Sequence, residues 1–249
     1  MQRYFVKKST NDHQFIIDGE DHHHIIKVMR MQLGECIICV DPEGKIAECK
    51  IAEITANQVV ADVVQWKEEN SELPIFITIA SGLPKGDKLD LIVQKGTELG
   101  AYEFIPFVAA RSIVKWDEKK ATKKVERWQK IAKEAAEQSH RAIMPDVVSP
   151  VSFKTLLQKS KQYDFKLVAF EDESRNGETS TFASTLKKMQ KGESLLLLFG
   201  PEGGLSQGEI QLLKENDFAV CGLGPRILRT ETAPLYALAA ASYHFELMG

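Results

Sequence analysis

The chain has 249 residues, 43% of them hydrophobic, which is enough for one large domain or for two domains with separate cores. Its formal net charge of -3 excludes the broad basic surface of many nucleic-acid-binding proteins, so any such contact must come from local patches. The start MQRYFVKK lacks the apolar core of a signal peptide, and the longest apolar run, residues 195–199, is too short to cross a membrane. We therefore expect a cytoplasmic protein without membrane contact, in which all four cysteines stay thiols.

The charge balance and the pattern of predicted elements both change near the polar stretch 67–72. Residues 1–73 carry 8 Lys/Arg against 13 Asp/Glu, a balance of -5, whereas residues 74–249 carry 24 against 22, a balance of +2. The first part contains short strand-like segments, and the second alternates strands with amphipathic helices. We predict two domains, residues 1–72 and 73–249.

Five short strands are predicted in the first part, at residues 3–6, 14–17, 35–40, 46–54 and 59–64. The turn Asp41-Pro42-Glu43-Gly44 should join two of them, because Pro sets the first central φ and Gly accepts a positive one. A helix over residues 21–31, capped by Asp21, interrupts the strands. Together these elements suggest a small β-barrel.

The second part begins with a predicted β-α-β unit: a strand in residues 75–83, a helix in residues 85–99 that Gly100 ends, and a strand in residues 102–110. Further strands are predicted at 165–170, 194–199 and 219–222, and helices at 117–142, 181–190, 207–216 and 233–248. Leu195 to Leu198 have no polar alternation, which indicates a central strand covered on both faces. The pattern predicts an α/β domain with a parallel sheet.

Two glycine-bearing turns near the carboxyl end are the strongest candidates for a ligand site. The first, Gly200-Pro201-Glu202-Gly203-Gly204, follows the buried strand and precedes a helix that Ser206 and Glu209 start as a capping box. Ligands of open α/β sheets bind beyond the carboxyl ends of strands, where glycines let the backbone approach them closely. Taken alone, this turn is better explained as an ordinary tight strand-to-helix connection.

The second turn runs from Gly222 to Ala233, and Thr232 before Pro234 marks the start of the next helix. Leu223 and Ile227 could hold an adenine ring, and polar groups follow at Arg229, Thr230 and Glu231. Neither turn is a phosphate cradle, because the first lacks the Lys-Ser/Thr of a P-loop and the second lacks the third glycine of the dinucleotide fingerprint.

The ordered set of motifs resembles the SPOUT class of knotted methyltransferases, and specifically the bacterial 16S ribosomal RNA uridine-N3 methyltransferase family. The similarity covers nearly the whole chain. Its carriers are Arg3 in MQRYFV, residues 24–34 (HIIKVMRMQLG), residues 95–100 (KGTELG), Pro106, Arg111-Ser112, residues 134–141 (EAAEQSHR), Pro145 and both glycine turns.

This resemblance implies a PUA-like β-barrel before a trefoil-knotted methyltransferase domain, S-adenosylmethionine as methyl donor, 16S rRNA in the small ribosomal subunit as partner, and a homodimer. The implied cofactor-binding residues are Phe170, Gly200, Pro201, Glu202, Gly203, Leu223, Gly224, Ile227, Leu228, Arg229, Thr230, Thr232 and Ala233. The implied RNA-binding residues are Arg3, His24, Lys27, Arg30, Arg111, Gln138 and Arg141.

Two basic segments and one metal-like pattern also have simpler explanations. Lys27 and Arg30 could both face phosphates, or lie on a solvated helix. Residues 85–141 hold 13 Lys/Arg against 9 Asp/Glu, an excess that could follow an RNA backbone or merely keep a helix soluble. His22–His24 with Cys36 and Cys39 suggest zinc by count alone, but residues 36 and 39 of a strand point to opposite faces, so we predict no metal.

Methylation of a uridine N3 requires alignment of donor and acceptor, loss of the N3 proton and positive charge near the ring oxygens. Arg229 is the candidate for charge stabilisation and Glu231 the candidate base; the alternative for Arg229 is an ion pair to Glu231 or Glu202 that only stiffens the turn. The alternatives are methylation of another base or ribose in rRNA or tRNA, and a non-enzymatic RNA-binding or ribosome-assembly factor.

Overall fold

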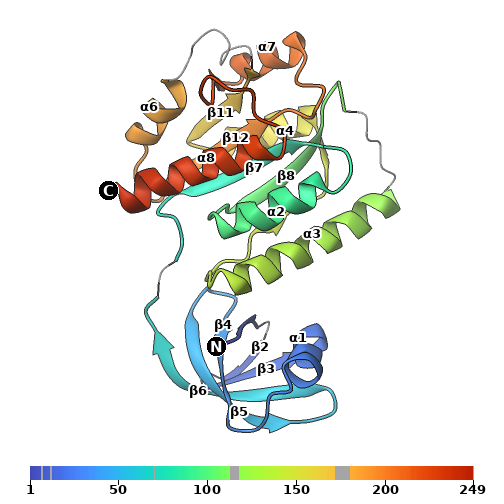
Figure 1. Ribbon diagram of the computed structural model, residues 1–249, viewed down its shortest axis with the longest axis vertical. Coiled ribbons are helices and arrows are strands. Elements are labelled where there is room, and N and C mark those ends of the chain that lie inside the picture. Colours follow the sequence, from blue (N-terminus) through green and yellow to red (C-terminus); the bar gives the residue numbers. More distant parts are fainter. Residues whose placement is uncertain (7, 12, 70, 113–117, 172–179, 249) are drawn as a thin grey trace. The chain divides into compact units, whose positions relative to one another are not determined.

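A computed structural model describes residues 1–6, 8–11, 13–69, 71–112, 118–171 and 180–248 (Figure 1). The chain forms two compact units. The first unit consists of Met1–Glu72 together with Ala136–Met144, and the second of Leu73–Ala135 together with Pro145–Gly249. The segment Ala136–Met144, which the sequence analysis placed in the second domain, therefore packs with the first unit.

The first unit is built on a curled sheet, which within the described residues has six strands in the order β1-β4-β5-β6-β3-β2. All neighbouring pairs are antiparallel except β1 with β4. The bounds are β1 Arg3–Phe5, β2 Lys8–Asn11, β3 Gln14–Asp18, β4 Cys36–Val40, β5 Ile46–Ile54 and β6 Gln58–Lys67. The five predicted strands are confirmed, and β2 was missed because Lys8–Asn11 has no apolar alternation.

The turn between β4 and β5 forms as predicted, since Gly44 has a φ of 80° and donates its N–H to the Asp41 carbonyl. The predicted helix after β3 is wrong in its bounds and in its cap. Helix α1 is Gly19–His23, its N-cap position is Asp18 without a side-chain cap, and Asp21 lies inside the first turn. The chain continues as a π-helical turn, His24–Val28, and the positive φ of Arg30 ends the helical segment.

The second unit contains a parallel sheet of seven described strands, in the order β10-β8-β7-β12-β11-β13 with β9 beside β8. Every pairing in it is parallel, as predicted. The bounds are β7 Phe76–Gly82, β8 Glu103–Val108, β9 Asp146–Val147, β10 Val151–Ser152, β11 Phe165–Ala169, β12 Ser194–Phe199 and β13 Ala219–Cys221.

Helices cover both faces of this sheet, so the second unit has three layers (Figure 1). The bounds are α2 Lys88–Glu98, α3 Glu118–Gln138, α4 Phe153–Lys159 with a 3-10 turn Ser160–Gln162, α6 Thr181–Lys188, α7 Gln207–Glu215, and α8 Thr232–Ser242 with a π-helical turn Tyr243–Leu247. Leu195 and Leu197 pack with α2, α3, α6 and α8, whereas Leu196 and Leu198 pack with α4 and α7. The prediction that β12 is central and covered on both faces is confirmed.

One predicted bound in the second unit differs from the structure, and the order of its strands was not predicted. The long helix ends at Gln138 instead of residue 142, because His140 takes a φ of 60° that an α-helix cannot include. Strand β13 follows β12 in sequence but does not pair with it. It pairs with β11, which lies between β12 and β13 in the sheet. The knot that the resemblance implies stays a prediction.

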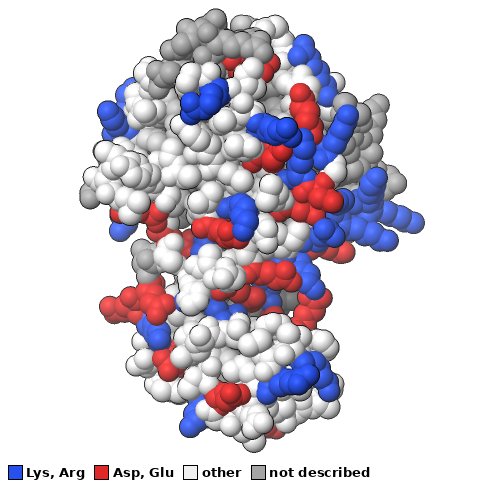
Figure 2. Space-filling view, in the orientation of Figure 1, with Lys and Arg blue, Asp and Glu red and all other residues white. Residues whose placement is uncertain are grey.

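Lys and Arg side chains do not form one broad basic surface on the face drawn in Figure 2, where they alternate with Asp and Glu. Among the described residues, no helix is both long and apolar enough to cross a membrane.

Candidate active site

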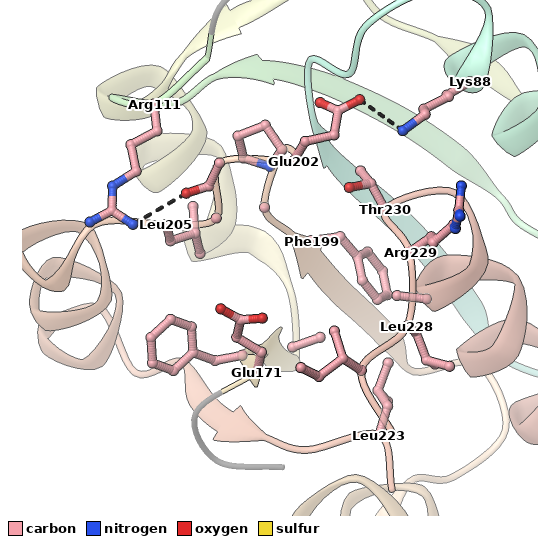
Figure 3. Close-up of a pocket in the computed structure, with 18 of the residues that line it drawn as sticks. Lys88, Arg111, Glu171, Phe199, Glu202, Leu205, Leu223, Leu228, Arg229 and Thr230 are labelled. Atoms are coloured by element: carbon pink, nitrogen blue, oxygen red, sulfur yellow. Dashed lines mark hydrogen bonds and ion pairs between the residues drawn. The ribbon is translucent and has the colours of Figure 1, made fainter. Parts of the chain in front are cut away.

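The two glycine turns meet at one edge of the parallel sheet. Strands β12, β11 and β13 are neighbours, so their carboxyl ends lie side by side. Beyond them lies a pocket of about 570 Å³ (Figure 3), walled by both turns and by the residues that follow β11. The sequence could only suggest that the two turns act together, and the fold brings both to the same pocket.

The first turn is pressed closely against the end of β7. A Cβ placed on Gly82 would lie 2.5 Å from Pro201 Cδ and 2.6 Å from Pro201 N, so only glycine allows this approach. At the other side of the turn, a Cβ on Gly203 would lie 3.1 Å from the Arg111 carbonyl oxygen. Gly204 closes the turn by donating its N–H to the Pro201 carbonyl, at 2.8 Å, with a φ of 68°. The shape of the turn is therefore set by contacts that exclude side chains.

The helix after the first turn is held by the predicted capping box. Ser206 Oγ accepts from the Glu209 N–H, and Glu209 Oε2 accepts from the Ser206 N–H at 2.8 Å. Glu209 is buried, and its other oxygen accepts from the Ala110 N–H, also at 2.8 Å. One carboxylate thus fixes the start of α7 and the segment after β8, which brings Arg111 to the pocket.

The second turn leaves β13 through Gly224, which has a φ of 93°, and enters α8 at Thr232. The Arg229 carbonyl accepts from the N–H groups of Thr232 and Ala233, at 2.9 and 3.0 Å. Glu231 is the N-cap residue, and no side chain caps this helix. Residues 227–230 form an irregular segment that lines one side of the pocket, as Figure 3 shows for Leu228, Arg229 and Thr230.

Lys88, at the start of α2, joins the two turns. Its Nζ lies 3.0 Å from Glu202 Oε1 and 3.4 Å from Glu231 Oε2. Glu202 also accepts from the Lys85 N–H at 3.0 Å. The hydrogen bond to Glu202 is the main reason that the pKa of Lys88 is raised. Sequence reasoning missed Lys88, because a lysine at a helix start carries no signal about partners so far along the chain.

The Glu202 carboxylate of the first turn responds to its partners. Burial acts to raise the pKa of Glu202, but backbone N–H groups of Glu202 and Lys85, together with the Lys88 ammonium, lower it overall. The Glu202 side chain is therefore a carboxylate at neutral pH. Glu171, which follows β11, is a second acidic group of the pocket.

The pocket combines an apolar wall with charged groups at its rim. Phe199, Leu205, Leu223, Leu228 and Ala233 supply apolar surface, and Figure 3 shows Glu171 on one side and Arg111 on another. Such a lining suits a ligand that has both a flat apolar part and charged ends.

Most predicted cofactor residues line this pocket. They are Phe170, Gly200, Pro201, Glu202, Gly203, Leu223, Ile227, Leu228, Arg229, Thr230 and Ala233. Gly224 and Thr232 are not among the lining residues. The pocket also takes residues outside the predicted cofactor set: Lys88, Arg111, Ala169, Glu171, Phe199, Gly204, Leu205, Gln207 and Arg226.

The two candidate catalytic residues have different surroundings. Arg229 is exposed at the rim, and among the described residues it forms no ion pair with Glu231 or Glu202. The ion pairs with Glu202 and Glu231 are formed by Lys88 instead of Arg229. Glu231 is partly buried and paired with Lys88, so the two candidates lie in one turn without contacting each other through an ion pair.

The candidate RNA-binding residues divide into two groups. Arg3 and Arg141 are each 3% exposed, and both are engaged within the first unit, which gives them a structural role there. Arg3 donates to Glu69 and to the Arg141 carbonyl, and Arg141 donates to Glu72. The others are more open: Lys27, Arg30, Arg111 and Gln138 are exposed, and His24 is half-buried with its Nδ1 3.0 Å from the Tyr4 hydroxyl.

The cysteines are free thiols, as expected. Cys36 is half-buried and Cys39 is buried, in keeping with opposite faces of β4. Across the described ranges, no group of three or more His, Cys, Asp and Glu side chains is arranged to hold a metal ion.

Comparison with known proteins decides the family. The RNA methyltransferase domain family matches residues 71–242, and the RNA methyltransferase PUA domain matches residues 17–64. Ribosomal RNA small subunit methyltransferase E of Bacillus subtilis (strain 168) is 54% identical over 252 residues, covering 100% of this chain and 98% of the relative. The chain belongs to the ribosomal RNA small subunit methyltransferase E family.

Solved structures agree with this membership. A hypothetical protein of known structure is 52% identical, covers 100% of both chains and superposes with a TM-score of 0.92. The small subunit methyltransferase E of Neisseria gonorrhoeae, solved with S-adenosyl methionine, is 28% identical, covers 98% of both chains and has a TM-score of 0.85. As a member of this family the protein is an RNA methyltransferase, with a PUA domain at its start.

Proposed function

We propose that the protein methylates N3 of a specific uridine in 16S rRNA of the small ribosomal subunit, with S-adenosylmethionine as donor. The observation that carries this proposal is the pocket at the ends of β11, β12 and β13, which both glycine turns enclose. The relative from Bacillus subtilis, named for the small subunit, supports the choice of RNA. Such a reaction belongs in the cytoplasm, where ribosomal RNA is available.

The residues of the pocket fit the donor. About 570 Å³ lies within the range of roughly 300–1,000 Å³ that small-molecule sites occupy. We assign Leu223, Ile227 and Leu228 to the adenine side, where close backbone and apolar side chains favour a flat ring. When bound, the donor supplies a methyl group on a positively charged sulfur, and the carboxylates of Glu171 and Glu202 favour its positive charges.

The side chains of the second turn would act on the uridine. Arg229 is exposed beside the pocket and free to place positive charge near a ring oxygen, which favours loss of the N3 proton. Glu231 is the proposed proton acceptor. Because Lys88 Nζ lies 3.4 Å away, this carboxylate must loosen that ion pair or accept the proton through a water molecule.

The RNA must present an unstacked base to the pocket, and we assign its flanking contacts to exposed residues. These are Lys27 and Arg30 in the first unit, with His24 nearby, and also Gln138 and Arg111. Arg111 lines the pocket itself and donates to the Gly203 carbonyl at 3.2 Å. Arg3 and Arg141 stabilise the first unit and are not assigned to RNA.

We further propose a homodimer formed by α8 and the turn that follows it. The α8 sequence TAPLYALAAAS is apolar on nearly all sides, and Tyr236, Tyr243 and Leu247 remain exposed. A helix that is apolar all round is normally covered. Since Ala233 of this helix lines the pocket, a second subunit here would lie next to the donor site.

Transfer of a labelled methyl group tests the proposed function. Purified protein and labelled donor are incubated with small subunits from a strain that lacks the enzyme, with free rRNA or with tRNA, and the modified nucleotide is mapped by mass. We expect label at N3 of one uridine of 16S rRNA. Label in tRNA, at another base or on a ribose would overturn the proposed substrate.

The same assay tests the role of Arg229. Arg229→Ala should lower the rate constant by more than about tenfold, since it removes charge that acts only as the anion develops. Arg229→Lys keeps the charge and should retain part of the rate. A correctly folded Arg229→Ala protein within about threefold of wild type would show that Arg229 has no catalytic role.

A further inference from the structure

The first half of α3 has a dense row of basic side chains that the donor pocket does not use. Lys119, Lys120, Lys123, Lys124 and Arg127 follow a spacing that places all five on one side of the helix. The opposite side packs into the core through Val125, Trp128 and Ala132. We call the five residues the α3 basic face, and Figure 2 shows blue side chains gathered over this part of the molecule.

This face lies at the pocket edge of the second unit. Helix α3 comes after β8, whose carboxyl end is at the same edge of the parallel sheet as the glycine turns. Its side chains reach the start of α2: Arg127 Nη2 lies 2.7 Å from Asp90 Oδ2, and Lys124 Nζ lies 3.9 Å from Asp87 Oδ1. Asp87 directly precedes Lys88, which lines the pocket.

Between positions 119 and 127 the sequence holds five basic residues and one acidic residue. Asp87 and Asp90 pair with the two basic residues nearest α2, and Glu126 is the one further described acidic residue between positions 119 and 127. Lys119, Lys120 and Lys123 are all exposed. A local positive potential therefore remains in a chain whose net charge is -3.

We propose that the α3 basic face binds the phosphate backbone of the substrate RNA beside the nucleotide that enters the pocket. This inference rests on the proposed function and extends it to a site of RNA contact. From residue 119 to residue 127 the helix rises by about 12 Å, enough to follow more than one phosphate. Lysines at such a surface act as sequence-independent point charges, which hold the RNA in register and leave base recognition to the pocket.

The test compares two variants that lose the same charge. K119Q/K120Q/K123Q neutralises the α3 basic face with a residue of similar helix propensity. K187Q/K188Q/K191Q is the control, because these exposed lysines at the end of α6 precede β12 and so lie at the opposite edge of the sheet. For each protein, small-subunit binding, methyl transfer and calorimetric donor affinity are measured over a range of salt concentrations.

For the α3 variant we expect a KM for small subunits about tenfold or more above wild type at low salt, with kcat and donor affinity unchanged. The slope of log KM against log salt should fall by about 2 units, since each lost phosphate contact removes roughly 0.7–0.9. The control should stay within about twofold. Equal KM values and slopes for the two variants would overturn the inference. If wild type binds subunits but transfers no methyl, the proposed function fails, while the binding data still decide on the face.

Discussion

At the scale of single residues, two arginines that the family resemblance assigns to RNA binding are buried and hydrogen-bonded within the first unit. Arg3 and Arg141 carry the family resemblance, and an arginine in an RNA-modifying enzyme suggests a phosphate contact. In the structure, Arg141 Nε lies 3.0 Å from Glu72 Oε2, and the other Glu72 oxygen accepts from the N–H groups of Ala142 and Ile143. Glu72 and Arg141 therefore hold the segment Ala136–Met144 within the first unit.

Replacing Arg141 should consequently affect folding before it affects RNA. We expect Arg141→Ala to lower the free energy of unfolding by about 3 kcal/mol, because Glu72 would keep a half-buried charge without its partner. Urea denaturation measures this loss. The control is Gln138→Ala, an exposed neighbour that should change stability by less than about 0.5 kcal/mol. A stable Arg141→Ala protein with a raised KM for RNA would instead support the hypothesis that Arg141 contacts a phosphate.

At the scale of elements, the sequence predicted those features that depend on residues close together along the chain. The unbroken leucines of β12, the capping box of α7 and the Gly44 turn each depend on residues close in sequence, and each is confirmed. The two-residue strands β9 and β10 and the short helix α4 were missed, because they are too short to show a period. The Asp21 cap was wrong because the helix begins directly after β3, at Gly19.

The close approach of β7 to the first turn gives a prediction for this scale. Gly82→Ala should destabilise the protein by about 1–3 kcal/mol, because the new Cβ meets Pro201 backbone and ring atoms and must push the turn aside. Donor affinity, measured by calorimetry, should fall with it.

Gly208→Ala is the matched control for Gly82→Ala. Gly208 is in α7, has open space around it and has no positive φ, so alanine there should stabilise the protein by about 0.5–1 kcal/mol. Unfolding curves of equal midpoint for the two variants would show that the turn is not held by this contact.

At the scale of the whole molecule, the donor pocket depends on topology that no local pattern contains. It takes residues from the ends of three strands, and β11 separates β12 from β13 although the chain passes through them in the order β11, β12, β13. Periodicity could identify each strand but not their order, so the set of cofactor residues came from the family resemblance. Lys88 and Glu171, which neither the turns nor the resemblance named, entered the site only through the fold.

The proposed dimer is the last feature at this scale, and a charge on α8 tests it. Tyr236 is 43% exposed on a helix that is otherwise apolar, so Tyr236→Asp would bury an unpaired carboxylate in the proposed interface. Leu212→Asp on α7, a residue of matched 44% exposure, is the control. By sedimentation we expect Tyr236→Asp to be a monomer and Leu212→Asp a dimer.

Methyl transfer to small subunits should be lost in the Tyr236→Asp monomer and kept in the Leu212→Asp dimer. The reason is geometric, since Tyr236 lies one helical turn beyond Ala233, which lines the donor pocket. A second subunit on this face would thus help to form the surface that receives the RNA. A Tyr236→Asp monomer with full activity would show that each subunit carries a complete site, and a wild-type monomer would remove the proposed interface itself.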